Sequence, residues 1–162
     1  MKTIKRICAV VMAAFALCAT LYAQSASKPT VIIMPFETSG GVSQEDCDIV
    51  TEMFESKYVV ASNCTVINHS TIAKTQAVLS DSNQADSRNP SLLGQALNAQ
   101  QVVKGQIRLY NDIVYFTVQV QDIGTLAVLA SVNIRVKSTM QLLDKIPGIC
   151  KDLAGQVGGT SK

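Results

Sequence analysis

The stretch that decides the fold is residues 101–136, QVVKGQIRLYNDIVYFTVQVQDIGTLAVLASVNIRV. Apolar and polar residues alternate with a period of two over 103–109, 114–120 and 128–136. This alternation is typical of strands that have one buried and one polar face. Asn111-Asp112 and Gly124-Thr125 separate the three runs. Because connections this short join antiparallel neighbours, the stretch predicts a three-stranded antiparallel meander.

The polar face of this meander is its most distinctive chemical feature. It carries the basic residues Lys104, Arg108, Arg135 and Lys137, with Gln106, Tyr115, Thr117, Gln119 and Asn133 between them. A solvated face is common in antiparallel sheets and is the simpler interpretation. The alternative is a basic docking surface for a protein partner or an anionic wall polymer. Both interpretations remain open at this point.

Upstream of the meander, the sequence predicts a strand, a helix and a second strand. The apolar run TVIIMPF at 30–36 indicates a strand buried on both faces, and a turn follows at 38–41. Ser43 is placed to cap a helix that runs to about residue 60. An apolar stripe at helical spacing indicates the buried side of this helix: Cys47, Val50, Phe54 and Tyr58. Residues 64–68 form the second predicted strand.

Two further helices are predicted before the meander, and one is predicted after it. One helix begins at Ser70 or Thr71 and ends near residue 79, and a polar surface loop follows at 81–88. Asn89-Pro90 is typical of a helix start, and a short helix is expected over 91–98. A last amphipathic helix extends from about residue 142 to 157. Pro147-Gly148 predicts a kink or break in this helix, and residues 158–162 are expected to be a disordered tail.

These elements together predict one α/β (α+β) domain over residues 30–157. A β-α-β unit with parallel strands comes first, and the antiparallel meander comes last. We therefore expect a single mixed sheet of about five strands with helices packed on it. Nearly half of the residues, 48%, are apolar, which is enough for one core.

The N-terminus has the composition of a secretory signal peptide. A basic start, with Lys2, Lys5 and Arg6, precedes an apolar run over 7–21 and small residues near Ala23. We expect cleavage after Ala23, a polar leader at 24–29, and a periplasmic location. Cys18 offers a minor alternative, an outer-membrane lipoprotein, although Leu17 is large for a lipid-attachment site.

Removal of residues 1–23 leaves a nearly neutral domain. The 14 basic and 12 acidic residues of the whole chain become 11 and 12, because the signal peptide contains three basic residues and no acidic ones. This balance does not favour nucleic acid as a partner.

Three cysteines remain after signal removal: Cys47, Cys64 and Cys150. A helix between Cys47 and Cys64 would separate them by about 20 Å at 1.5 Å per residue, far beyond the reach of a disulfide. Cys64–Cys150 is the better pair for a disulfide, since both could lie at one end of the sheet. The other interpretation is three free thiols.

The sequence contains no recognisable catalytic constellation. The single histidine, His69, has no acidic residue within ten positions, and a capping or surface role is the simpler explanation for it. Nucleophile-elbow, phosphate-loop and dinucleotide motifs are missing from the sequence. The cysteine spacing does not suggest a metal site. We therefore expect no enzymatic activity, no metal and no cofactor.

Several segments resemble a known group of bacterial envelope proteins. These are VIIMPFE at 31–37, LGQALNAQQVVKGQI at 93–107 and VYFTVQVQDIGTLAVLASVNI at 114–134. They are similar to a domain shared by penicillin-binding protein activators of the LpoB type, CsgG-type curli secretion proteins, FlgO-type flagellar proteins and the N-terminal domain of TolB. The resemblance covers about residues 30–157. Within it, Gly105 and Asp122 match positions that look structural, one for close packing and one for a turn.

The resemblance implies an α/β domain that binds proteins in the envelope and has no enzymatic activity. Two departures matter: the chain lacks a proper lipid-attachment box, and the threonine–glycine turn of the family is reversed here as Gly124-Thr125. No long insertion suits a curli-type pore. The first hypothesis is a non-enzymatic periplasmic module that docks on an envelope protein, such as a peptidoglycan synthase, through the polar sheet face or a helix edge. The alternative is a self-associating component of a flagellar or secretion machine.

Overall fold

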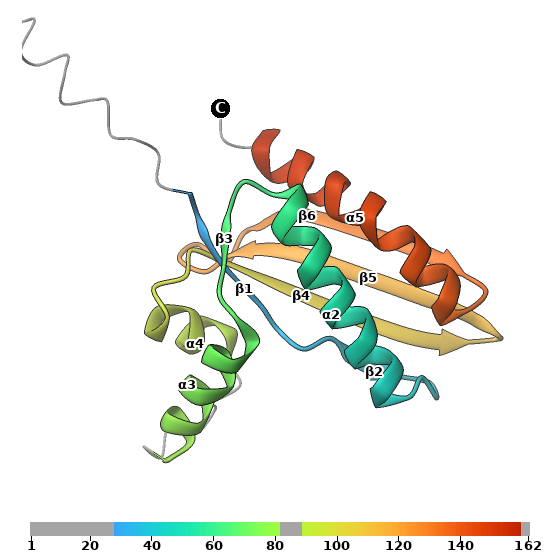
Figure 1. The fold of residues 1–162 in the computed structure, drawn as a ribbon, viewed down its shortest axis with the longest axis horizontal. Coiled ribbons are helices and arrows are strands. Elements are labelled where there is room, and N and C mark those ends of the chain that lie inside the picture. The colour runs from blue at the N-terminus through green and yellow to red at the C-terminus, as the bar shows by residue number, and fades with distance from the viewer. Residues whose placement is uncertain (1–27, 82–88, 160–162) are drawn as a thin grey trace, which may run out of the picture.

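The computed structural model describes residues 28–81 and 89–159 of the 162-residue chain (Figure 1). The predicted signal peptide and most of the predicted 81–88 loop lie outside the described residues. The fold is one mixed sheet with helices on it, as the sequence predicts, and the sheet has six strands. Five strands follow the order β3 (Thr65–Val66), β1 (Thr30–Ile33), β4 (Gln101–Tyr110), β5 (Ile113–Asp122) and β6 (Val128–Val136). The sixth strand, β2 (Glu37–Ser39), also pairs with β4.

The predicted meander is confirmed, and its first two strands are longer than the sequence pattern indicates. β4 and β5 pair over ten residues each, from Gln101↔Asp122 to Tyr110↔Ile113. Asn111 and Asp112 connect them with φ angles of 49° and 57°. Two successive left-handed residues match the twist of a tight hairpin, and asparagine and aspartate tolerate that conformation.

The predicted first strand over 30–36 is wrong in one respect, because it is interrupted. β1 ends at Ile33, and the chain pairs with β4 again only from Glu37. Pro35 has no N–H to donate to a neighbouring strand. At the break, the N–H of Phe36 donates to Oγ1 of Thr51 over 3.2 Å, and Sγ of Cys47 donates to the carbonyl of Phe36 over 3.1 Å. The predicted turn at 38–41 therefore contains part of β2.

The parallel β-α-β unit is confirmed. β1 and β3 are parallel, and α2 (Gln44–Ala61) connects the β1–β2 segment to β3. Ser43 caps α2, since its side chain accepts a hydrogen bond from the N–H of Asp46. β3 is shorter than predicted, and α3 (His69–Asp81) begins one residue before the predicted start. The side chain of Asn68 accepts from the N–H of Ser70 at that start.

Two helices complete the chain. α4 (Pro90–Ala96) begins as predicted, with Asn89 as the cap and Pro90 in the first turn. α5 (Thr139–Gly159) corrects the prediction, because it continues through Pro147 and Gly148 without a break. It also includes Gly158 and Gly159, which were predicted to belong to a disordered tail. Three of its core contacts flank the proline, namely Ile146, Ile149 and Cys150, and this packing outweighs the missing N–H.

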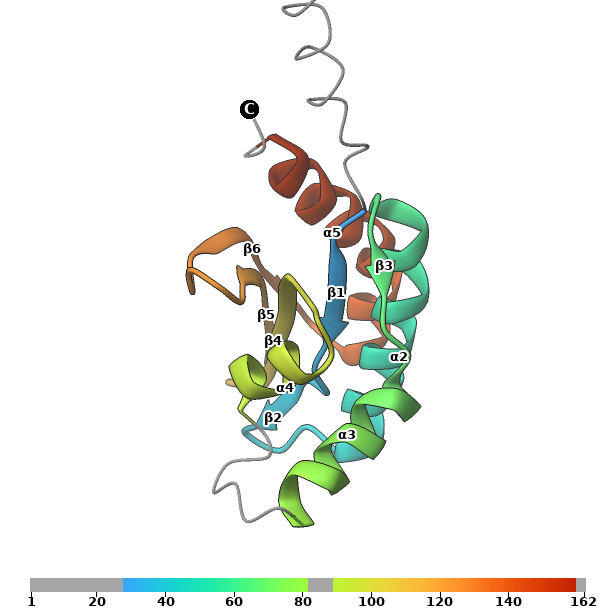
Figure 2. The same cartoon turned by 90° about the vertical axis from the view of Figure 1, so that its left-hand side faces the viewer.

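The core has two parts on opposite faces of the sheet (Figures 1 and 2). The larger part lies under α2 and α5, which pack against each other. The smaller part lies under α3 and α4 and includes Ile32, Ile72, Leu93 and Val102. Because α3 and α4 cover only one end of their face, the remainder of that face is exposed.

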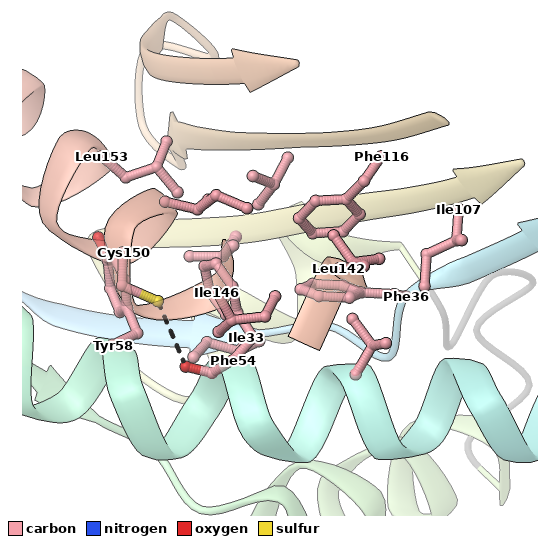
Figure 3. Packing of buried hydrophobic residues seen from close by; sticks show 14 of the residues in the cluster. Ile33, Phe36, Phe54, Tyr58, Ile107, Phe116, Leu142, Ile146, Cys150 and Leu153 are labelled. Atoms are coloured by element: carbon pink, nitrogen blue, oxygen red, sulfur yellow. Dashed lines mark hydrogen bonds between the residues drawn. The ribbon is translucent and has the colours of Figure 1, made fainter. Parts of the chain in front are cut away.

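Aromatic rings form the centre of the larger core (Figure 3). The Phe36 ring lies 5.2 Å from Phe54 and 5.4 Å from Phe116, and Phe54 stacks on Tyr58 at 5.4 Å. Gly105 lies directly beneath Phe36, because a Cβ atom there would meet the ring at 2.5 Å. The close packing expected at Gly105 is therefore present.

Candidate functional site

The part of the sheet that α3 and α4 leave uncovered is the candidate site. Even-numbered residues of β4 and odd-numbered residues of β5 and β6 point to this side. We call it the open face and define it by nine residues: Lys104, Gln106, Arg108, Tyr115, Thr117, Gln119, Ser131, Asn133 and Arg135. All six members on β4 and β6 are exposed, as is Gln119, and Tyr115 and Thr117 are half-buried. The sequence pattern therefore assigned this face correctly.

Strand register arranges the open face in rows that run across three strands. Arg108, Tyr115 and Arg135 form one row. Gln106, Thr117 and Asn133 form the next row, and Lys104, Gln119 and Ser131 form the third. Arg108 and Arg135 therefore lie on either side of Tyr115, and Lys104 lies two rows away from them.

Two of the predicted basic residues form hydrogen bonds with uncharged side chains. Nζ of Lys104 donates to Oε1 of Gln121 over 3.0 Å, and Nε of Arg108 donates to Oγ of Ser39 over 3.2 Å. Lys137, the fourth predicted residue, lies beyond the last residue of β6, and its backbone N–H donates to Oε1 of Gln141. The structure thus brings three of the four predicted residues onto the paired strands and leaves Lys137 in the connection to α5.

Two pockets lie on this side of the sheet. The larger, of about 1080 Å³, extends from the open face to α3 and α4 and is lined in part by Glu37, Gln76 and Lys104. The smaller, of about 390 Å³, is lined by Gln106, Arg108, Tyr110, Tyr115, Thr117 and Asn133. Tyr110, Glu37 and Ser39 were not among the predicted site residues. No sequence pattern pointed to Glu37 and Ser39, because residues 38–41 were expected to form a turn and not part of a strand.

The three described cysteines are free thiols. Cys47 and Cys150 are buried, and Cys64 is half-buried. Burial raises the pKa of Cys150 to about 12 and also raises the pKa of Cys47 and Cys64. Sγ of Cys150 lies 3.8 Å from the carbonyl oxygen of Phe54 (Figure 3). These thiols are poor nucleophiles, because only the thiolate reacts readily. The Cys64–Cys150 disulfide remains a prediction for the oxidised protein.

His69 is the first residue of α3 and is exposed. Across residues 28–81 and 89–159, no group of three or more His, Cys, Asp or Glu side chains is placed to hold a metal ion. Within the same ranges, no helix is long and apolar enough to cross a membrane.

Asp122 organises the turn between β5 and β6. Its Oδ1 accepts from both the N–H and the hydroxyl of Thr125, over 2.7 and 2.8 Å. These hydrogen bonds lower the pKa of Asp122. A carboxyl whose pKa is lowered by folding stabilises the protein above its unfolded pKa, and this contribution is lost as the pH falls through the folded pKa.

Replacement of Asp122 with asparagine is therefore expected to destabilise the protein most at neutral pH. The difference in the free energy of unfolding between the two proteins should narrow on acidification, because the wild-type carboxylate becomes protonated. Urea unfolding across an acidic pH series measures this difference. A difference that stays constant with pH would show that the charge of Asp122 does not stabilise the turn.

Charge reversal on the open face is expected to leave the fold intact. Exposed substitutions change the free energy of unfolding by less than about 0.5 kcal/mol each. Thermal unfolding of the triple variant Lys104→Glu, Arg108→Glu, Arg135→Glu should therefore give a cooperative transition near that of the wild type. The matched control reverses Lys57, Lys145 and Lys151, which are exposed on α2 and α5. An unfolded open-face variant beside a folded control would mean that the face is not free.

The fold is similar to that of several solved structures, although the sequence matches no family model and no curated protein. The C-terminal domain of LpoB from Salmonella enterica matches with a TM-score of 0.51 and 12% identity, over 75% of this chain and 92% of that one. A lipoprotein from Neisseria meningitidis matches with a TM-score of 0.57 and 13% identity, over 82% and 99% of the two chains. A PelC dodecamer from Paraburkholderia phytofirmans matches with a TM-score of 0.53 and 11% identity, over 78% and 88%. The chain thus has the fold of the LpoB C-terminal domain.

Proposed function

We propose that the protein is a non-enzymatic binding module of the bacterial envelope, and that it acts on a penicillin-binding protein as activators of the LpoB type do. The uncovered open face, on a domain with the LpoB fold, is the observation that carries this proposal. A sheet face with helices packed at one end only is accessible to a partner, and its three cations favour an acidic surface on that partner.

Three further features support the proposal. The N-terminal sequence has the pattern of a signal for export to the periplasm, where peptidoglycan synthases act. The raised thiol pKa values and the solitary, exposed His69 give no pair of groups for nucleophilic catalysis. The sequence segments that resemble LpoB-type activators, 93–107 and 114–134, include most of the three strands that form the open face.

A second candidate function is self-association in an envelope assembly. β6 is a nine-residue edge strand that pairs with β5 on one side only. Its Ser131 N–H donates to Oε1 of Gln156 in α5 over 3.1 Å. Edge strands are ready sites for pairing with another chain. The similar PelC structure is a dodecamer, which also favours this candidate.

Photo-crosslinking in the exporting bacterium separates the two candidates. A photoreactive residue is placed at Gln119 or Asn133 on the open face, and at Glu52 or Lys151 on the opposite side as matched controls, all of which are exposed. The proposal predicts that only the open-face positions capture a penicillin-binding protein. Capture of a second copy of the chain, from positions near β6, would favour self-association. Equal capture of all proteins from both sides would contradict a function of the open face.

A further inference from the structure

The smaller pocket of the open face is built from one complete row of side chains and two members of the neighbouring row. Arg108 and Tyr115 come from one row, and Gln106, Thr117 and Asn133 form the next. Tyr110 also lines the pocket and is 62% exposed. A volume of about 390 Å³ is in the range of pockets that hold small ligands. The pocket therefore combines two aromatic rings, a guanidinium and neutral hydrogen-bonding groups.

The two arginines are placed to bind carboxylates on either side of a ring. Register places Arg108 and Arg135 next to Tyr115 on the two neighbouring strands. The hydrogen bond from Nε of Arg108 to Ser39 fixes one edge of its guanidinium, so that the terminal nitrogens stay available. Guanidinium groups bind carboxylates in a bidentate geometry that a lysine cannot provide.

The second row provides groups that both donate and accept hydrogen bonds. The amides of Gln106 and Asn133 and the hydroxyl of Thr117 have this property. Sugar hydroxyls also donate and accept, whereas a carboxylate only accepts. This row therefore suits a ligand rich in hydroxyl groups better than the carboxylate side chains of an acidic peptide.

A third cation lies on the open face beyond this second row. Lys104 lies two rows from Arg108, which corresponds to about 13 Å along the strand. Glu37 of β2 pairs in register with Gln106, so the second row also has an exposed carboxylate at its β2 edge. This carboxylate can accept hydrogen bonds from sugar hydroxyls, whereas it repels the carboxylates of an acidic peptide. An extended ligand along β5 would thus meet an aromatic and cationic row, then a row of hydrogen-bonding groups with Glu37 at its edge, and then a row that contains Lys104.

We propose that the open face binds an acidic polysaccharide, in which sugar rings carry carboxylates. A sugar ring lies on Tyr115, because the C–H groups of the sugar pair with the negative face of the aromatic ring. Arg108 and Arg135 bind the carboxylates, and Gln106, Thr117 and Asn133 bind the hydroxyls. The polysaccharide and the protein partner proposed above would compete for Arg108 and Arg135. A titration of the protein alone tests polysaccharide binding separately from partner binding.

Nuclear magnetic resonance titration of the mature exported protein tests this site. The probes are a trimer of galacturonic acid, the neutral trimer of galactose, and a short polyglutamate peptide. We expect the acidic trimer to shift the signals of the Tyr115 ring and of the Gln106 and Asn133 side-chain amides. The neutral trimer and the peptide should bind at least about tenfold more weakly.

Substitutions separate the contribution of the arginine charges to binding from that of the Tyr115 ring. Arg108→Gln with Arg135→Gln should weaken binding of the acidic trimer by about tenfold or more, and Tyr115→Ala should weaken both trimers. Lys57→Gln with Lys151→Gln is the matched control and should leave binding unchanged. Thermal unfolding checks that each variant is folded.

Three results would overturn the proposal. The first is the absence of shifts on the open face with the acidic trimer. The second is equal affinity for the acidic and the neutral trimer. The third is polyglutamate binding as tight as that of the acidic trimer, which would assign the face to acidic protein segments.

Discussion

Replacement of Phe54 with alanine is expected to lower the free energy of unfolding by about 3–5 kcal/mol. The Phe54 side chain is fully buried in α2, at 0% exposure, and it contacts Phe36 edge to face and stacks on Tyr58. Its removal leaves a cavity between α2, α5 and the sheet, and the neighbouring rings cannot close it without losing their own contacts. Urea unfolding followed by circular dichroism measures the loss.

Met53 offers the matched control for this substitution. It precedes Phe54 in α2 and is 36% exposed, so Met53→Ala should cost much less than Phe54→Ala. Similar losses for the two variants would mean that the aromatic cluster does not form the centre of the core.

The substitution Gly105→Ala is expected to destabilise the protein by about 1–3 kcal/mol. Alanine is normally preferred over glycine within a strand, so the expected sign is opposite to the intrinsic preference. The reason is the Phe36 ring, whose Cδ1 atom would lie 2.5 Å from the new Cβ. The ring cannot move away, because Phe54 and Phe116 hold it from two sides.

Gly148→Ala provides the control for this prediction. Gly148 lies in the exposed part of α5, and a Cβ atom there has no neighbour within 4 Å. Alanine at this position should raise the free energy of unfolding by about 0.5–1 kcal/mol, because glycine is unfavourable within a helix. A stabilising effect at Gly105 as well would show that the ring does not lie on β4.

The fold could be predicted where the sequence has a strong local pattern, either apolar–polar alternation or a helix-capping residue. Alternation over residues 103–136 placed three strands, and Ser43 and Asn89 placed the starts of two helices. The predictions failed where tertiary contacts opposed a local rule. Pro147 does not break α5, because core residues on both sides of it hold the helix together. The first strand failed for the opposite reason, because Pro35 follows its local rule and interrupts the pairing, and side chains of α2 bind the backbone at Phe36 instead.

The candidate site was predictable only in part, for a physical reason. Alternation shows which residues share a face, and it correctly grouped Lys104, Arg108 and Arg135. Register determines which residues lie side by side, and it depends on hairpin geometry that alternation does not specify. The row of Arg108, Tyr115 and Arg135, and the contact of Arg108 with Ser39, therefore emerged only from the structure.

The central claim, that the open face binds an envelope partner, is tested most directly by in-cell crosslinking of the charge-reversed protein. The tagged wild type, the triple variant at Lys104, Arg108 and Arg135, and the matched variant at Lys57, Lys145 and Lys151 are compared by mass spectrometry of what each captures. We predict that the wild type and the matched variant capture a penicillin-binding protein, and that the open-face variant loses it while remaining folded. Undiminished capture by the folded open-face variant would contradict the claim.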